Sequence, residues 1–337
     1  STGTLSLSDN LTNRSIHSSL HIEVVCSSLI SFDILIDVFS GSVPQKTQGP
    51  STVSRNSTFN IKLLEKVFYI WYNYSMKLVT LKAEKDIQLF PIGDVQYGPP
   101  ACDINGFQRW VDYAMSHKNP MFIGTGDYID LGSPSNRNSI IADIKKGNLY
   151  DTIQEALDTK SREFLEVIKD ILKPTRGKWL GLVEGHHYWE YADGTTTDKE
   201  LADYLGCEFL GTSGIVTMKL PKKQQCSIWL HHGKGGGSAI GGPLTQLEKM
   251  LHSFDADIYL IGHHHKKVAT KVQKLYANNQ KLSHKDVILA CTGSWLKGYM
   301  QDSDTYVEKG MMTPAALGGI KIDIKAENSS MDMEIVL

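Results

Sequence analysis

The sequence has no long uncharged apolar run. No stretch reaches about 18 such residues, and the best candidate, residues 24–40, contains Asp33 and Asp37 and lacks a basic segment before it. A transmembrane helix needs about 20 predominantly apolar residues, and a secretory signal begins with a positively charged region. The sequence therefore predicts a cytoplasmic protein without a transmembrane helix or signal peptide, and we expect no membrane partner.

Paired cysteine motifs and excess positive charge are also absent. No two of the five cysteines have C-x-x-C spacing, so neither a zinc knuckle nor a redox motif is indicated. An odd, scattered set of thiols is typical of a reducing compartment. The formal net charge of -2 gives no overall attraction to nucleic acid, but it does not exclude a local basic groove. The cysteines are Cys26, Cys102, Cys207, Cys226 and Cys291.

The chain divides by composition near Met76. Residues 1–75 are rich in Ser, Thr and Asn and lack sustained periodicity, whereas Met76 is followed by a strand-like segment. We interpret residues 1–75 as an N-terminal extension that contributes little to function. Its composition leaves both disorder and a small accessory domain open. Residues 76–337 form the predicted catalytic domain, with 41% hydrophobic residues in the whole chain, enough to bury a core.

From Met76 onward, predicted strands alternate with predicted helices, which indicates an α/β fold. Helical spacing of apolar residues predicts helices over 104–116, 150–172, 199–205 and 244–254. Apolar runs predict strands over 78–81, 87–92, 121–123, 178–183, 214–220, 226–231, 258–261, 287–290 and 319–324.

Five of the apolar strands end in polar groups with a glycine beside them. They are followed by Gly93-Asp94-Val95-Gln96, by Gly124-Thr125-Gly126-Asp127-Tyr128-Ile129-Asp130, by Glu184-Gly185-His186-His187, by His231-His232-Gly233 and by Gly262-His263-His264-His265. Ligands of α/β folds bind at the carboxyl ends of strands, and glycine permits close approach of the backbone. These five segments therefore predict one functional site.

Seven of the 12 histidines lie in three of these segments. Taken singly, a strand-end Asp is usually a turn or capping residue, and a lone histidine is usually a core or surface residue. Carboxylate and carboxamide oxygens combined with imidazoles, without thiolates, suit Mn, Fe, Zn or Co. Six or seven ligands exceed the four of one tetrahedral site, so two divalent metal ions fit better.

The motifs in this order resemble the calcineurin-like metallophosphoesterases. The family pattern D-x-[HQ], G-D-x-x-D, G-N-H-[DE], H-G and G-H-x-H is matched by DVQ (94–96), GDYID (126–130), GHHY (185–188), HHG (231–233) and GHHH (262–265). The resemblance spans most of residues 86–325. It implies a four-layer α/β-β/α sandwich with two mixed sheets, and metal-dependent hydrolysis of phosphoesters through a two-metal site with a bridging hydroxide.

The resemblance also implies the metal ligands. Asp94, Gln96 and His265 would hold the first metal, and Asp127 would bridge both. The second metal would take His186, His263 and one histidine of the 231–232 pair. His232, directly before Gly233, is favoured, with His231 as the alternative.

The remaining motif residues receive other roles from the resemblance. His187 would protonate the leaving oxygen, Asp130 would orient a ligand or the loop, and His264 would point away from the metals. His186 stands where the family has Asn, and Tyr188 replaces the usual acid. This departure puts the second metal in doubt.

The substrate class stays open at this point. The expected partner is a phosphoester, with a nucleotide or nucleic acid included, and the oligomeric state is not indicated. One alternative is a metal-dependent nuclease acting on DNA ends. Another is a protein that retains the fold and binds metal with weak or no catalysis, for which the departure at position 186 is the main support.

Overall fold

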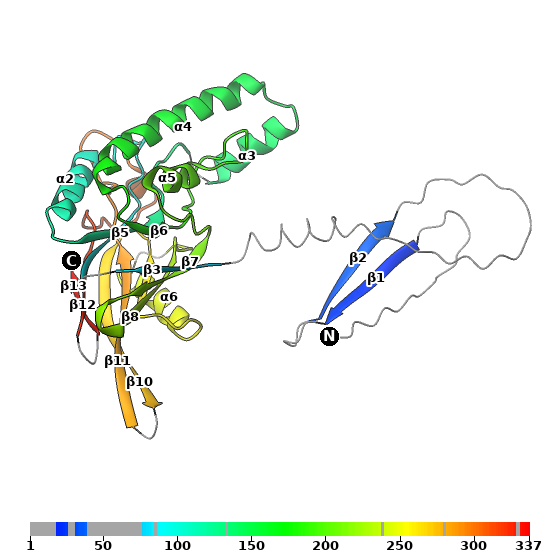
Figure 1. The fold of residues 1–337 in the computed structure, drawn as a ribbon. Coiled ribbons are helices and arrows are strands. Elements are labelled where there is room, and N and C mark those ends of the chain that lie inside the picture. The colour runs from blue at the N-terminus through cyan, green and yellow to red at the C-terminus, as the bar shows by residue number, and fades with distance from the viewer. Residues whose placement is uncertain are drawn as a thin grey trace, which may run out of the picture. The chain divides into compact units, whose positions relative to one another are not determined.

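The computed structural model describes residues 18–25, 31–38, 76–83, 86–132, 134–236, 239–278, 281–327 and 331–337. The chain divides into two compact units, Ser1–Leu63 and Leu64–Leu337. In the first unit, the described residues form strands β1 (Ser18–Val25) and β2 (Ser31–Val38), which pair antiparallel (Figure 1). The interpretation of residues 1–75 as an extension stays a prediction, because most of this range lies outside the described residues.

The second unit contains two mixed β-sheets. The six-stranded sheet has the order β10-β11-β9-β8-β7-β3 and the five-stranded sheet the order β13-β12-β4-β5-β6. Both combine parallel and antiparallel pairs. The strands are β3 (Lys77–Lys82), β4 (Ile87–Gly93), β5 (Pro120–Gly126), β6 (Trp179–Leu182), β7 (Ser213–Lys219), β8 (Gln225–His231), β9 (Ile258–Ile261), β10 (Lys267–Asn278), β11 (Lys281–Thr292), β12 (Lys321–Ala326) and β13 (Met331–Val336).

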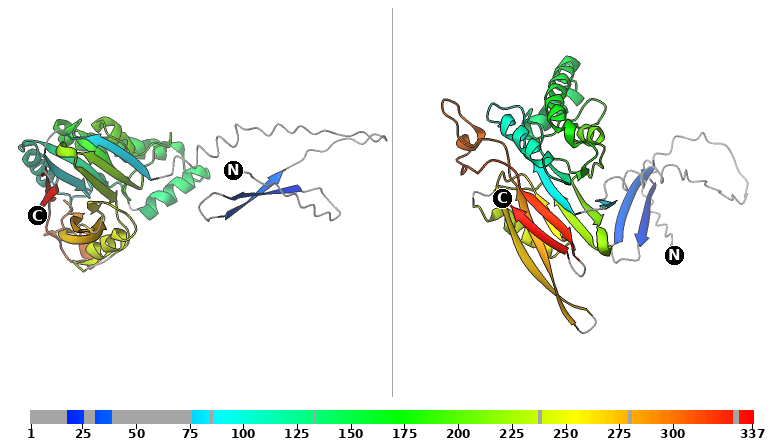
Figure 2. Two further views of the ribbon diagram at one scale, coloured as in Figure 1. Left: turned by 60° about the horizontal axis from the view of Figure 1, so that its bottom comes forward. Right: turned by 60° about the vertical axis from the view of Figure 1, so that its left-hand side comes forward.

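Three apolar cores separate four layers. The largest lies between the sheets and joins side chains such as Leu89 of β4 and Leu230 of β8. A second packs the five-stranded sheet against α2 (Ile104–Met115), α4 (Asp151–Leu172) and α5 (Thr197–Leu205), and a third packs the six-stranded sheet against α6 (Gly242–Leu251) (Figures 1 and 2). The predicted α/β-β/α sandwich with two mixed sheets is therefore confirmed.

Local sequence fixes where these helices begin and end. The Asp103 side chain accepts a hydrogen bond from the Gly106 N–H at the start of α2, and Thr196 accepts one from Lys199 at the start of α5. Gly206 ends α5 with φ 73°, the left-handed conformation that glycine adopts most easily. These caps set the register in which each helix buries its apolar stripe.

The strand directions place the polar segments at one edge of each sheet. Strands β4, β5 and β6 run parallel in one sheet, and β8, β9 and β11 run parallel in the other. Their carboxyl ends therefore face the same edge of the sandwich, where loops carry the polar residues of the five motifs.

Five elements of the second unit differ from the sequence-based prediction. Helix α3 (Pro134–Lys145), strands β10 and β13 and the short helix α7 (Tyr306–Lys309) were not expected, and β11 extends well beyond the predicted 287–290. Residues 287–292 of β11 are buried, whereas most of its first half is exposed or half-buried. The apolar run therefore marks only the part of the strand that reaches the core.

No helix in the described part of the chain is both long enough and apolar enough to cross a membrane.

Candidate metal centre

Polar side chains from the two sheets meet at the carboxyl ends of their parallel strands. Contacts between side chains and backbone link all seven predicted metal ligands and the predicted proton donor into one cluster. The five-stranded sheet supplies Asp94 and Gln96 after β4, Asp127 after β5, and His186 and His187 after β6; the six-stranded sheet supplies His232 after β8, and His263 and His265 after β9.

Asp127 lies at the centre of the cluster and is 1% exposed. Its Oδ1 accepts hydrogen bonds from the backbone N–H groups of His186 (2.5 Å) and His187 (2.8 Å). Its Oδ2 is buried without a hydrogen-bond partner. Burial alone would raise the pKa of Asp127, but His232 and the N–H of His187 hold that pKa below its ordinary range. The carboxylate therefore stays charged, with one oxygen directed away from its hydrogen-bond donors.

His232 directs a nitrogen to the same place. Its Nδ1 lies 2.6 Å from the carbonyl oxygen of Thr125, which only accepts hydrogen bonds, so Nδ1 carries the hydrogen. In the neutral ring this leaves the lone pair on Nε2, which is 3.1 Å from Asp127 Oδ2 and is buried without a hydrogen-bond partner. Burial would lower the pKa of His232, but Asp127 raises it to about 9. The two atoms thus favour a positive charge between them, whether a proton or a metal ion.

An oxygen-rich donor group lies on one side of Asp127. It consists of Asp94, Gln96 and His265: His265 Nε2 is 3.5 Å from Asp94 Oδ1 and 3.2 Å from Gln96 Nε2. A half-turn of the Gln96 amide would present its oxygen instead. Burial and then Asp127 raise the pKa of Asp94 to about 8, against the opposing effect of His232, and burial lowers the pKa of His265 to about 4.

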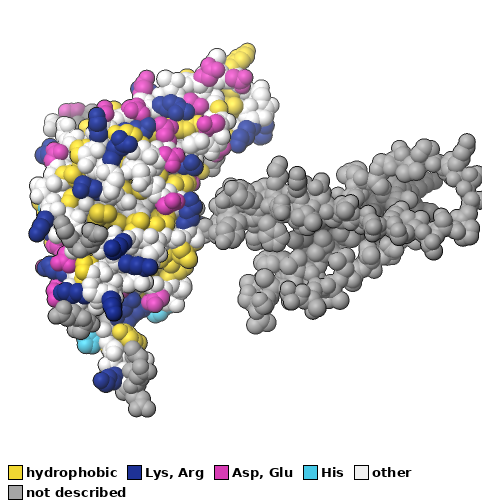
Figure 3. Space-filling view, in the orientation of Figure 1, with side chains coloured by type: hydrophobic (Ala, Val, Ile, Leu, Met, Phe, Trp, Pro, Cys, Tyr) yellow, Lys and Arg dark blue, Asp and Glu magenta, His cyan; other side chains and the backbone are white. Residues whose placement is uncertain are grey.

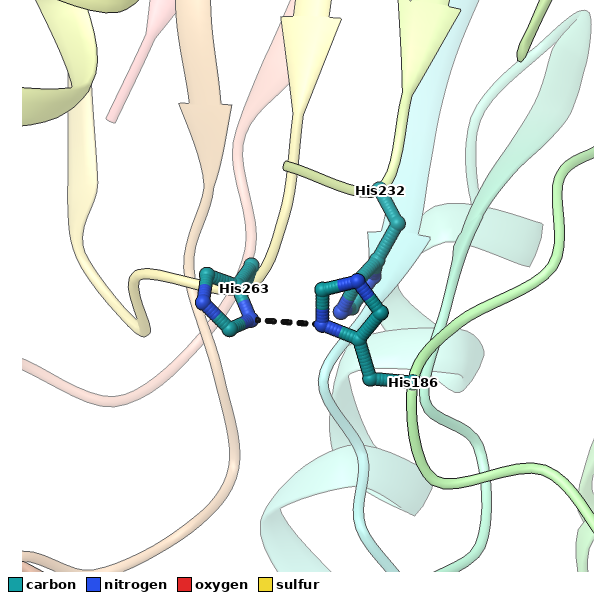
Figure 4. A group of neighbouring side chains, drawn as sticks. All are labelled: His186, His232 and His263. Atoms are coloured by element: carbon teal, nitrogen blue, oxygen red, sulfur yellow. Dashed lines mark hydrogen bonds between the residues drawn. The ribbon is translucent and has the colours of Figure 1, made fainter. Parts of the chain in front are cut away.

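A group of imidazoles lies on the other side. One ring nitrogen of each of His186, His232 and His263 lies within 4.8 Å of the others. Nδ1 of His186 is 3.2 Å from Nδ1 of His263 (Figure 4). His263 Nε2 donates to the carbonyl oxygen of Gly235 at 2.9 Å, which leaves the lone pair on Nδ1. Burial and neighbouring imidazoles lower the pKa of His186 to about 4 and also lower the pKa of His263. The rings of His186 and His263 therefore favour the neutral form, as metal ligation requires.

The oxygen-rich group and the imidazole group meet at Asp127 and His232. Ligand atoms of Asp94, Asp127 and His232 also lie within 4.8 Å of one another. Asp127 and His232 therefore stand between the oxygen-rich group and the imidazole group. Unpaired buried lone pairs together with oxygen and nitrogen donors fit divalent transition metals.

The backbone at the site is strained. Five of the clustered residues, Asp94, Gln96, Asp127, His263 and His265, have φ values between 48° and 66°. Side chains other than glycine rarely adopt this left-handed conformation, and it costs about 1–3 kcal/mol where the surrounding structure imposes it. The fold therefore holds these five side chains in positions that relaxed strand ends would not give.

Two motif glycines leave room for the carboxylates. A Cβ atom at Gly185 would lie 2.1 Å from Asp127 Oδ1, and one at Gly262 would lie 2.7 Å from Asp94 Oδ2. Any larger residue would push these carboxylates out of the cluster. The glycine beside each polar group is therefore a steric requirement.

His187 stands beside the donor groups. Its Nδ1 donates to Asp130 Oδ1 at 2.9 Å, which leaves Nε2 as the nitrogen available to a substrate. Burial would lower the pKa of His187, but the hydrogen bond and charge of Asp130, together with Asp127, raise it. The ring therefore holds its proton to higher pH than a free histidine.

The remaining two motif histidines are engaged elsewhere. His231 Nδ1 accepts a hydrogen bond from the Gly233 N–H (2.7 Å), and its ring stacks on Trp229. His264 Nε2 is 3.2 Å from Gln246 Oε1. Of the 231–232 pair, His232 is thus the residue that faces Asp127.

Sequence reasoning missed Arg137, which lies on α3 and is 7% exposed. Its Nη1 donates to the carbonyl oxygens of His186 and Tyr188, each at 2.6 Å, and its guanidinium lies 3.9 Å from the centre of the Tyr188 ring. Arg137 therefore clamps the backbone on either side of His187. It sits in a polar segment without helical periodicity, so the sequence carries no signal for this role.

Asp198 was also missed. It is 1% exposed and accepts a hydrogen bond from the Gly185 N–H at 2.8 Å. Burial raises the pKa of Asp198 to about 7. An acidic residue in the first turn of a helix is common for helix stability alone, so the sequence carries no signal for this role.

A cavity of about 530 Å³ opens in front of these groups. Its lining includes Gln96, Asp127, His187, His263, His264 and His265. Residues between 296 and 315 also line it. The cluster is therefore accessible to a small molecule.

No protein-family model and no curated protein matches the chain. Among solved structures, wild-type Vps29 complexed with Zn²⁺ from Entamoeba histolytica aligns at 15% identity, covering 74% of this chain and 98% of that one, with a TM-score of 0.33. Vacuolar Protein Sorting 29 from Cryptosporidium parvum aligns at 14% identity (75% and 97% coverage, TM-score 0.32). A predicted phosphoesterase from Streptococcus pneumoniae TIGR4 aligns at 10% identity (75% and 91% coverage, TM-score 0.31). Likeness at these scores does not decide the family of the chain.

Proposed function

We propose that this protein is a calcineurin-like metallophosphoesterase, a hydrolase that cleaves phosphoesters with two divalent metal ions. The observation that carries the proposal is the buried pair of Asp127 Oδ2 and His232 Nε2. The two atoms lie 3.1 Å apart between two further donor groups and have no hydrogen-bond partner outside the pair. A buried pair of this kind is costly unless a cation or proton joins it. The order of the five motifs along the chain supports the same family.

The donor groups divide the ligands between two metal ions. Asp94, Gln96 and His265 would hold one ion, His186, His232 and His263 the other, and Asp127 both. Bound at these residues, such ions would neutralise the phosphate charge and lower the pKa of a water molecule to about 7. Both oxygen and nitrogen donors are present, which is compatible with Mn, Fe, Zn or Co.

His187 is proposed as the general acid. Asp130 accepts the Nδ1 hydrogen and fixes the ring, so the proton on Nε2 is the one that His187 can give to the leaving oxygen. Although burial acts to lower the pKa of His187, the hydrogen bond to Asp130 raises it, which favours the protonated ring. His187 also lines the cavity, where the leaving oxygen would lie.

A metal-binding protein without turnover is the second candidate. Its support is His186, an imidazole where the family places an Asn side chain. His186 also lies close enough to the Nδ1 of His263 for the two rings to hold one ion tightly, which would slow exchange of ligands at that ion.

The test combines metal analysis with a substrate panel. The full chain is stripped with a chelator, reloaded separately with Mn, Fe, Zn and Co, and assayed on nitrophenyl monoesters and diesters and on labelled DNA. We expect close to two ions per chain and hydrolysis of at least one ester. Two bound ions without turnover of any ester would favour the second candidate, and no bound metal would overturn both.

A further inference from the structure

A loop between β11 and β12 stands over the candidate metal centre. Residues 298–315, here called the 298–315 loop, lie between the end of β11 at Thr292 in the six-stranded sheet and the start of β12 at Lys321 in the five-stranded sheet. Backbone bridges pair Leu296 with Cys102 and Ser294 with Gly318, which closes the base of the loop. The loop projects from the body of the second unit (Figure 2, right-hand view).

The loop exposes several large apolar side chains. Tyr299 is 48% exposed, Tyr306 68%, Met311 90% and Met312 39%. Single exposed apolar residues are ordinary, but a concentrated group marks a surface that contacts another molecule. These four lie within one short segment that contributes little to the buried cores.

Three of these side chains, Tyr306, Met311 and Met312, also line the cavity of the metal centre. The same lining includes the buried Val307 of the loop, together with His187, Gln96, Asp127, His263 and His265. The cavity volume of about 530 Å³ is within the range of about 300–1,000 Å³ found for small-molecule sites. One continuous space therefore joins the metal donors to an apolar wall.

The side chains that line the cavity carry little positive charge. Among the described residues that line it, Lys266 is the only lysine or arginine, and its Nζ donates to the carbonyl oxygen of Ala239 at 2.7 Å. A nucleic-acid strand would bring several phosphates, which proteins bind with several lysines and arginines. On the face of the second unit seen in Figure 3, acidic and basic side chains are interspersed rather than gathered into one basic stripe.

We propose that the 298–315 loop binds the alcohol part of the substrate, and that this alcohol is small and carries an apolar or aromatic group. This inference rests on the proposed phosphoesterase function. The phosphate would lie at the metal donors and the organic group against Tyr306, Met311 and Met312. Methionine side chains adapt their shape and make favourable contacts with aromatic rings, and a tyrosine ring can stack on a planar group.

The loop keeps its shape through contacts that spare the proposed binding side chains. The Tyr299 hydroxyl donates to the carbonyl oxygen of Met312 at 3.0 Å, and the Thr305 hydroxyl donates to that of Gly298. Thr305 Oγ1 also accepts from the Glu308 N–H at 3.1 Å. Because the Met311 side chain is 90% exposed, its removal should not unfold the loop.

The experiment compares the binding of two phosphonates that cannot be hydrolysed. Calorimetry on the metal-loaded full chain measures the Kd of phenylphosphonate and of methylphosphonate, and labelled single-stranded DNA is added as a competitor. We expect the wild-type protein to prefer phenylphosphonate. In the double variant Met311→Ala, Tyr306→Ala, the ratio of the Kd for methylphosphonate to the Kd for phenylphosphonate should fall about tenfold. Leu282→Ala, which removes a 75% exposed side chain of β11 outside the cavity lining, is the matched control and should keep the preference.

The outcomes separate this inference from the proposed function. Equal binding of the two phosphonates, an unchanged preference in the double variant, or stronger binding of the DNA than of phenylphosphonate would each overturn the role of the loop. A phenyl preference that depends on the loop, in a protein that hydrolyses no ester, would support the loop and overturn the phosphoesterase function. Hydrolysis of aromatic esters with an increased KM and unchanged kcat in the double variant would support both.

Discussion

The two walls of the cavity are built in different ways. The wall at the strand ends consists of buried and half-buried polar residues, five of them in a left-handed backbone conformation, held by hydrogen bonds from several elements. The 298–315 loop presents several exposed apolar side chains and is held mainly by contacts within the loop. The difference indicates a division of labour. Changes in the strand-end wall should affect metal binding and the hydrolysis of every ester alike. Changes in the loop should affect some esters more than others, according to the alcohol that each contains.

The largest effect is expected at the centre of the strand-end wall. Asp127→Asn keeps the shape of the side chain but removes the charge that both donor groups share. We expect metal content to fall and hydrolysis to reach background with every metal, measured by elemental analysis and nitrophenyl ester turnover. Asp255→Asn, at a side chain that is 88% exposed, is the control. A variant at Asp127 with full metal content and activity would show that this carboxylate is not a shared ligand.

The next largest effect is expected from loss of the proton donor. His187→Ala should lower kcat by about 100- to 10,000-fold on alkyl esters and by less on nitrophenyl esters, whose leaving oxygen needs no proton. Metal content and the preference for phenylphosphonate should not change. His284→Ala, at an exposed histidine of β11 outside the cavity lining, serves as control. Equal losses on both ester types would argue against proton donation by His187.

Arg137 tests whether the strand-end wall depends on its support. Arg137→Met removes the two hydrogen bonds that hold the backbone on either side of His187. We expect kcat to fall about tenfold with little change in KM, and the free energy of unfolding to fall by about 2 kcal/mol. Lysine lacks the planar fork, so Arg137→Lys should not restore the rate. Arg109→Met, on the exposed surface of α2, should change neither quantity.

His186 tests the composition of the imidazole group. His186→Asn restores the residue that the family has at this position and replaces a ring nitrogen by an oxygen ligand. We expect tighter binding of the second metal or a severalfold higher activity with Mn, because oxygen donors suit harder ions. Titration with Mn and Zn measures both. No change in either would mean that His186 is not a ligand.

The smallest effect is expected in the pH profile. A general acid works only while protonated, so activity falls as pH rises through the pKa of His187. Asp130 raises that pKa, and Asp130→Asn should lower it. The alkaline limb of kcat against pH should therefore move to lower pH, with metal content unchanged. An alkaline limb that stays in place would assign it to another group.

Much of the fold could be predicted because apolar periodicity marks the elements that reach a core. Helix α3 was missed because it buries little, and β10 because its strand continues beyond the core with polar residues. The strand ends were found because a glycine and a polar residue follow each apolar run. This signal depends only on short-range sequence.

The resemblance favoured His232 over His231, but the apolar pattern of the strand alone could not choose between the two. Neighbouring residues of a strand face opposite sides of the sheet. In β8, Ile228 and Leu230 lie in the core between the sheets, whereas Trp229 faces α6. His232 continues the first alternation and reaches the other sheet, and His231 continues the second. Only the packing of the two sheets shows which side holds the metal donors.

The five residues with positive φ have a consequence for engineering. Glycine tolerates this conformation better than Asp, Gln or His, so replacing any of the five with glycine relieves strain of about 1 kcal/mol while deleting a donor. A screen that selects heat-resistant clones in the presence of a chelator would therefore enrich inactive variants at Gln96, His263 and His265. Asp94 and Asp127 would not be replaced, because their carboxylates also accept hydrogen bonds from backbone N–H groups, and losing these costs more than the strain. The same screen with saturating metal should retain the native residues at these positions, because metal binding adds stability only to chains with intact donors. Thermal selection would thus locate the ligands without any substrate.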